Sequence, residues 1–303
     1  MRAPSSLPLA AMILVLSVSA AALADAPPAD RSARVSSVAM DSATIAALPR
    51  DEKLPAGELN ARAALDASPR HGEWVDVPLK DGAPLHAWIV YPERHDKAPV
   101  VMIIHEIFGL SDWIRAVADQ LAREGFIAVA PDLVSGFGVG GGGTESLASR
   151  DDVVKAIRSI TPEIASARLN ATFDWATRLP SASGRGGSIG FCWGGGYSFA
   201  FACARPDLKA AVVYYGVSPD SAQLIRLKAP VLGLYGGDDM RVDATIDPAR
   251  RVLASLHRHY VAHVFDGAGH GFLRAQTQRE GANLRATQQA WPLTVDFLRN
   301  NLK

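Results

Sequence analysis

Cysteine is scarce in this chain: Cys192 and Cys203 are the only two in 303 residues. A disulfide framework is therefore excluded, and the fold must depend on its hydrophobic core. Excess charge of either sign is also lacking, because 31 Lys and Arg residues balance 31 Asp and Glu residues. This balance argues against nucleic-acid binding, which needs a basic surface. Beyond the N-terminus, no apolar run reaches the ~18 residues of a membrane span.

The N-terminus has its own pattern. Arg2 precedes an apolar stretch from Leu9 to Val18, and small residues follow, ending in Ala22-Leu23-Ala24. This order is typical of a secretory signal peptide cleaved after Ala24, with Ala26 as a second cleavage position and an uncleaved membrane anchor as the alternative. We expect residues 1–24 to be a signal peptide and the mature protein to be periplasmic or secreted.

The rest of the chain predicts one α/β domain. Residues 25–70 are rich in Ala, Pro, Ser and charge, which predicts a flexible leader with one helix over 57–66. From residue 71 onward, a predicted hairpin around Asp81-Gly82 comes first. Continuous apolar runs such as 99–104 then alternate with helical patterns such as 111–125. We expect a mostly parallel central sheet with helices on both faces over 71–303.

The strand-to-helix junction at residues 190–194 is unusual. Its sequence, G-F-C-W-G, has the form G-x-nucleophile-x-G, in which a sharp turn holds a nucleophile above the sheet. Cys192 is therefore a candidate nucleophile, and a buried Cys on a glycine-rich turn is the alternative. Cys203, among Phe and Ala residues, is expected to be buried.

The order of later residues favours the nucleophile. In this type of site the acid and the histidine follow the nucleophile, each after a later strand. Asp238 and Asp239 follow the strand at 230–236, and His270 follows the strand at 259–266 between two glycines. We favour Asp239 as the acid, with Asp238 as the alternative, and a surface loop histidine is the alternative for His270.

A fourth junction, at residues 103–109, follows the first central strand. The backbone N–H groups of Trp193, after the nucleophile, and of Ile107, in this loop, are expected to form an oxyanion hole. Glu106 lies among apolar residues here; it is either a buried auxiliary group or an exposed loop carboxylate. His105 and Glu106 do not form a zinc motif, because Gly109 stands where H-E-x-x-H requires histidine.

These four motifs together resemble the dienelactone hydrolase family of the α/β-hydrolases. The resemblance rests on H-E-I-F-G at 105–109, G-F-C-W-G-G at 190–195, G-G-D-D at 236–239 and G-A-G-H-G-F at 267–272, and it extends from residue 71 to the C-terminal helix. It implies an α/β-hydrolase fold and a cysteine-dependent hydrolase of lactones or carboxylic esters. It also implies Cys192 as nucleophile, His270 as base, Asp239 as orienting acid and Glu106 as a contact of the resting thiol.

The substrate-binding residues agree only partly with the family. Pro131-Asp132-Leu133 is followed by Val134-Ser135-Gly136, without the arginine that known members have there. Arg274, four residues after His270, matches a second carboxylate-binding arginine of the family, and a surface arginine is the alternative. The substrate is thus expected to be a small ester or lactone, and an anionic one if Arg274 binds it.

No metal and no cofactor is expected. His257, His259 and His263 follow strand rather than metal-ligand spacing, and the glycine-rich stretch 136–143 lacks the Gly-Lys-Ser/Thr of a phosphate loop. Two alternative functions remain: a broad carboxylesterase or thioesterase with the same triad, and a non-catalytic binding protein of the same fold.

Overall fold

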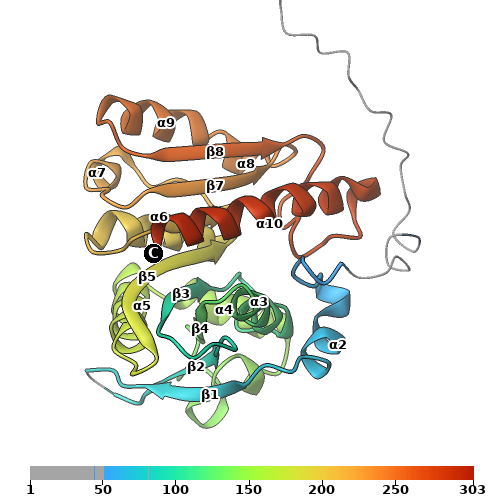
Figure 1. Cartoon of the computed structure of the whole chain (residues 1–303), viewed down its shortest axis with the longest axis vertical. Coiled ribbons are helices and arrows are strands. Elements are labelled where there is room, and N and C mark those ends of the chain that lie inside the picture. Colours follow the sequence, from blue (N-terminus) through green and yellow to red (C-terminus); the bar gives the residue numbers. More distant parts are fainter. Residues whose placement is uncertain (1–43, 45–50, 81) are drawn as a thin grey trace, which may run out of the picture. The chain divides into compact units, whose positions relative to one another are not determined.

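The strands form one sheet in the computed structural model, which describes Thr44, residues 51–80 and residues 82–303. The signal peptide predicted over 1–24 lies outside the described residues. The eight described strands lie in the order β1-β2-β4-β3-β5-β6-β7-β8 (Figure 1). Their bounds are β1 Gly72–Val77, β2 Leu85–Val90, β3 Ala98–Ile104, β4 Ile127–Pro131, β5 Ala182–Phe191, β6 Ala211–Tyr214, β7 Val231–Gly236 and β8 Tyr260–Phe265.

The strand pairing confirms a mostly parallel sheet that starts with a hairpin. β1 and β2 pair antiparallel with each other, and β2 pairs antiparallel with β4. All further neighbours, from β4 through β8, pair parallel. The carboxyl ends of the parallel strands therefore meet at one edge of the sheet, which is where ligands bind in such folds.

Helices connect the parallel strands. Ser111, Ser149 and Thr161 accept hydrogen bonds from backbone N–H groups at the starts of the helices that begin at Asp112, Arg150 and Pro162. Pro162 begins a new helix, so residues 150–159 and 162–177 form two separate helices. The helices are α2 Ala61–Asp66, α3 Asp112–Arg123, α4 Arg150–Ser159, α5 Pro162–Thr177, α6 Trp193–Ala204, α7 Ser221–Leu224, α8 Met240–Asp243, α9 Ile246–Ser255 and α10 Ala282–Asn301, with 3-10 turns η1 Glu58–Asn60, η2 Val139–Gly141, η3 Thr144–Ser146 and η4 Arg279–Gly281.

The sheet has a hydrophobic core on each face. Along β3, Val100 and Met102 belong to one cluster with residues of α5, α6 and α9. Val101 and Ile103 belong to the other, with residues of α3 and α10. Successive strand residues point to opposite faces, so a strand that is apolar throughout is covered on both sides. No helix of the described part of the chain is long and apolar enough to span a membrane.

The end of the predicted leader differs from our expectation, because residues 51–70 are packed onto the domain. Leu54 and Ala56 are buried, and α2 buries Ala61 and Ala64 beside α3 (Figure 1). Arg70 then pairs with Asp119 of α3, at 2.6 Å between Nη2 and Oδ2. Alanine side chains carry little hydrophobic signal, so the composition of this segment hid its packing.

Candidate active site

Cys192 lies in the sharp turn between β5 and α6. Its backbone has φ 56° and ψ −117°, a conformation that is strained for a residue with a side chain. Glycine neighbours make this turn possible. A Cβ on Gly194 would lie 2.2 Å from the carbonyl oxygen of Ile104, and one on Gly195 would lie 2.6 Å from that of Tyr214. The strained turn holds the Cys192 side chain at the carboxyl edge of the sheet.

The Cys192 thiol is largely buried and neutral at rest. Burial raises its pKa to about 11, and the negative charge of Glu106 acts in the same direction. The backbone N–H groups of Trp193 and Ile107 donate toward the sulfur and oppose this rise, as does the positive charge of Arg241. The structure thus places the two predicted oxyanion donors together beside the sulfur.

His105 holds the loop that carries Ile107. Its ring is fully buried, its Nδ1–H donates to the carbonyl oxygen of Glu106 at 2.8 Å, and its Nε2 accepts from the N–H of Leu133 at 3.1 Å. Burial lowers the pKa of His105, consistent with a neutral ring that has one donor and one acceptor. The ring also stacks on Trp193, with centroids 5.8 Å apart. His105 therefore contacts both the loop of Ile107 and the ring of Trp193, the two residues predicted to supply the oxyanion donors.

Asp239 and His270 meet after β7 and β8. His270 Nδ1 lies 2.5 Å from Asp239 Oδ2, and the Asp239 carboxylate is buried. Asp238 points elsewhere and pairs with Arg279 at 2.7 Å. The loop of His270 is fixed by Asn283, which accepts a hydrogen bond from the Gly269 N–H at 3.0 Å. Of the two aspartates that the sequence offered, Asp239 is the one that the fold brings to the histidine.

Glu106 is buried, in contrast to the exposed loop carboxylate that was the alternative. Burial raises its pKa to about 7, although Arg274 opposes the rise. Arg274 Nε lies 2.8 Å from Glu106 Oε2, an ion pair whose geometry falls short of an aligned hydrogen bond. Arg274 is thus not a surface arginine, and one carboxylate of the protein already faces it.

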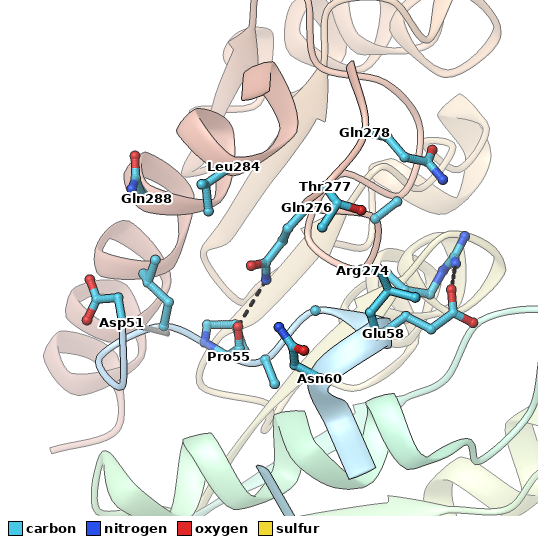
Figure 2. Close-up of a pocket in the computed structure, with 15 residues that line it drawn as sticks. Asp51, Pro55, Glu58, Asn60, Arg274, Gln276, Thr277, Gln278, Leu284 and Gln288 are labelled. Atoms are coloured by element: carbon cyan, nitrogen blue, oxygen red, sulfur yellow. Dashed lines mark hydrogen bonds and ion pairs between the residues drawn. The ribbon is translucent and has the colours of Figure 1, made fainter. Parts of the chain in front are cut away.

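A second carboxylate also contacts Arg274. Glu58, in the segment before α2, forms an ion pair with Arg274 Nη1, and Figure 2 shows the two side chains in contact. Glu58 also pairs with Arg150 at 3.0 Å, and its backbone N–H donates to the carbonyl oxygen of Arg274 at 2.9 Å. The segment that composition assigned to a leader therefore contributes a charged group next to the site.

Cys192 and His270 line the same pocket. Its volume is about 870 Å³, within the size range of small-molecule sites. Glu106 and two arginines, Arg241 and Arg274, also line it. The apolar part of the wall includes Ile107, Phe108, Leu169, Trp193, Tyr197 and Phe201. The pocket can thus hold a largely apolar molecule with one polar or charged end.

Sequence reasoning missed Tyr215 and Arg241. Tyr215 follows β6 with φ 40°, and its ring centroid lies 5.2 Å from that of His270. Its hydroxyl is buried and has no hydrogen-bond partner in the described part of the chain. An aromatic pair at the end of an apolar strand looks like part of the core, so the sequence carried no signal for Tyr215.

As for metals, the residues described include no group of three His, Cys, Asp or Glu placed to hold an ion.

Comparison with known proteins finds relatives that match most of this chain. The model of the dienelactone hydrolase family matches residues 85–302. A Yersinia pestis protein provisionally named a carboxymethylenebutenolidase is 30% identical over 71% of this chain and 84% of its own length. The carboxymethylenebutenolidase of Pseudomonas putida is 29% identical over 75% of this chain and 95% of its own. A crystal structure of a Klebsiella pneumoniae protein, provisionally named a dienelactone hydrolase, superimposes with a TM-score of 0.66 at 26% identity, covering 76% of this chain and 98% of that one.

Proposed function

The chain belongs to the dienelactone hydrolase family, and on that premise we propose that it hydrolyses lactones or carboxylic esters with Cys192 as nucleophile. The observation that carries this proposal is that three features occur together in one pocket. These are a cysteine on a strained elbow, two backbone N–H groups directed at its sulfur, and a histidine paired with a buried aspartate. Nucleophile, oxyanion donors and an oriented base are the parts that acyl transfer needs.

The first half of the reaction is acylation. With a pKa of about 11, only about one thiol in ten thousand is ionised at neutral pH, so the proton must leave as the sulfur attacks. In the proposed mechanism His270 takes this proton, and the sulfur bonds to the ester carbonyl carbon. The carbonyl oxygen becomes an oxyanion that the Trp193 and Ile107 N–H groups stabilise. The carbon–oxygen bond to the alcohol then breaks, and His270 returns the proton to the departing oxygen.

The second half is hydrolysis of the acyl thioester. His270 takes a proton from a water molecule that attacks the same carbonyl, and the bond to sulfur breaks to release the acid. Asp239 accepts the hydrogen bond from Nδ1 throughout, which leaves Nε2 as the nitrogen that carries the transferred proton. Burial, together with the charge of Glu106, keeps the resting thiol neutral until a substrate enters.

A broad carboxylesterase or thioesterase is the second candidate. The observation that favours it is the size of the pocket, about 870 Å³ with many aromatic and aliphatic side chains, which can take acyl groups larger than a small lactone. A series of 4-nitrophenyl esters of rising chain length, compared with small lactones, separates the two candidates by their kcat/KM values. A non-catalytic protein would hydrolyse neither.

The cysteine mechanism is tested by two matched variants. Cys192→Ala is expected to lose at least about 10³-fold in kcat. Cys203→Ala is the control, because Cys203 is buried in the core with its pKa raised to about 12. Mass spectrometry of rapidly quenched 4-nitrophenyl acetate reactions should find the acetyl group on the Cys192 peptide. Unchanged hydrolysis by Cys192→Ala would rule the mechanism out.

We also propose that the protein is exported, on the basis of the N-terminal sequence pattern. Expression of the full chain in a Gram-negative host, followed by N-terminal sequencing, is expected to give a mature protein beginning at Asp25. A chain that keeps its first 24 residues in the cytoplasmic fraction would contradict this proposal.

A further inference from the structure

Two arginines line the pocket of Cys192, and they differ in their partners. Arg274 faces Glu106 at 2.8 Å through Nε and Glu58 through Nη1. Its side chain is 18% exposed, so both contacts are largely shielded from solvent. The single positive charge of Arg274 is thus already faced by two carboxylates of the protein. Arg274, the substrate-binding residue expected from the family resemblance, is therefore already occupied by groups of the protein.

The Glu58 contact is built into the fold. Its segment is fixed to the loop after His270, since Gln276 Nε2 donates to the carbonyl oxygen of Pro55 at 3.0 Å (Figure 2). Leu54 and Ala56 on the same segment are buried. Arg150 holds the other oxygen of Glu58 at 3.0 Å. A substrate carboxylate would have to displace a charged group that is anchored at several points.

Arg241 is in the opposite situation. It lies in α8, two residues after Asp239, and its exposed side chain lines the pocket. Within residues 51–80 and 82–303, its guanidinium has no ion-pair or hydrogen-bond partner. Asp220, another charged group on the pocket wall, accepts a hydrogen bond from the Gln223 N–H at 2.8 Å as the cap of α7. Arg241 and Cys192 line the same pocket, and the positive charge of Arg241 acts to lower the pKa of the thiol.

We propose, on the basis of the hydrolase function above, that Arg241 binds a carboxylate on the acyl part of the substrate and sets a preference for anionic esters. A guanidinium presents paired N–H donors in a geometry that fits a carboxylate. In this proposal the substrate carboxylate is bound by Arg241, which follows Asp239, and not by Arg274, which follows His270. The reason is that the N-terminal segment supplies Arg274 with an internal carboxylate.

The first test compares two esters that release the same 4-nitrophenolate. One is the neutral 4-nitrophenyl acetate, and the other is 4-nitrophenyl hydrogen succinate, which carries a free carboxylate. In Arg241→Gln the ratio of kcat/KM for the succinate ester to that for the acetate ester is expected to fall about tenfold, mainly through KM. Arg251→Gln on α9, outside the pocket, is the matched control and should keep the wild-type ratio. An unchanged ratio in Arg241→Gln would overturn the proposal.

The second test does not require hydrolysis. Cys192 is alkylated with anionic iodoacetate and with neutral iodoacetamide, and the modified peptide is quantified by mass spectrometry. The effect of Arg241 on thiol ionisation is common to both reagents, so their rate ratio reports attraction of the anion alone. Arg241→Gln is expected to lower the iodoacetate-to-iodoacetamide ratio several-fold, and high salt should lower it in the wild type.

The two tests separate the two proposals. If neither ester is hydrolysed, the proposed function fails, while the alkylation ratio still decides the role of Arg241. If the esters are hydrolysed through Cys192 but both ratios are the same in Arg241→Gln and wild type, the function stands and the role of Arg241 is refuted.

Discussion

His270 and Asp239 lie 2.5 Å apart through Nδ1 and Oδ2, whereas Asp238, the next residue along the chain, pairs with Arg279. One residue of difference in the loop after β7 thus decides which carboxylate orients the imidazole. The buried position of Asp239 shields this contact from water, while Asp238 and Arg279 are each about half exposed, at 46% and 48%. The two neighbours make a matched pair for mutagenesis.

We expect Asp239→Asn to reduce kcat for ester hydrolysis by about 10²- to 10⁴-fold, because the amide cannot hold the imidazole with Nε2 free to accept a proton. Asp238→Asn removes the same charge one residue away and should stay within about twofold of wild type, since exposed ion pairs contribute little. Steady-state kinetics of both variants give the comparison. Equal losses in the two would show that the 2.5 Å contact has no catalytic role.

Glu106→Gln should make Cys192 more reactive. The ionised carboxylate raises the pKa of the thiol, so its removal lowers that pKa and increases the thiolate fraction. Alkylation of Cys192 by iodoacetamide at about pH 8 is expected to accelerate roughly tenfold, corresponding to about one pKa unit. Near pH 5, where Glu106 with its pKa of about 7 is protonated in the wild type, the two rates should converge. Slower labelling of the variant at about pH 8 would contradict this account.

The same carboxylate should make stability depend on pH. The pKa of Glu106 is raised from 4.5 to about 7 on folding, so the native state binds more protons than the unfolded state between these values. Stability contributed by this group therefore falls as the pH rises through that window, by about 3 kcal/mol in total. Urea unfolding of wild type and Glu106→Gln at about pH 4.5 and 8 measures it. The wild type should lose stability relative to the variant as the pH rises, and parallel pH curves would exclude the shift.

The elbow glycines should differ in their tolerance of a methyl group. A Cβ at Gly194 would lie 2.2 Å from the carbonyl oxygen of Ile104, so Gly194→Ala must displace β3 or the elbow. At Gly196 the nearest atom, Val217 Cγ2, is 3.4 Å away, which is ordinary contact. We expect Gly194→Ala to cost several kcal/mol of unfolding free energy or to prevent folding, and Gly196→Ala to remain within about 1 kcal/mol of wild type. Thermal unfolding and soluble yield compare the two variants.

The sequence carried most of the fold because its signals were local. Each signal affects only the few residues around it. Examples are the apolar run of β3, the helix caps Ser111 and Thr161, and Pro162 at the start of a helix. The segment before α2 had no such signal. Leu54 and Ala56 are buried in a cluster with residues of α3 and α10, far along the chain, and composition alone indicated a leader there.

For the site, the sequence by itself determined the elbow at Cys192 and the order along the chain in which Cys192, Asp239 and His270 each follow a strand, because glycine spacing and strand order are properties of the chain. Only the tertiary structure decided that Asp239 and not Asp238 meets His270, that Glu58 and Glu106 occupy Arg274, and that Arg241 remains unpaired among the described residues. These outcomes depend on contacts between residues up to 216 positions apart. Such long-range contacts are set by how the sheet and its helices pack, and no local sequence pattern encodes them.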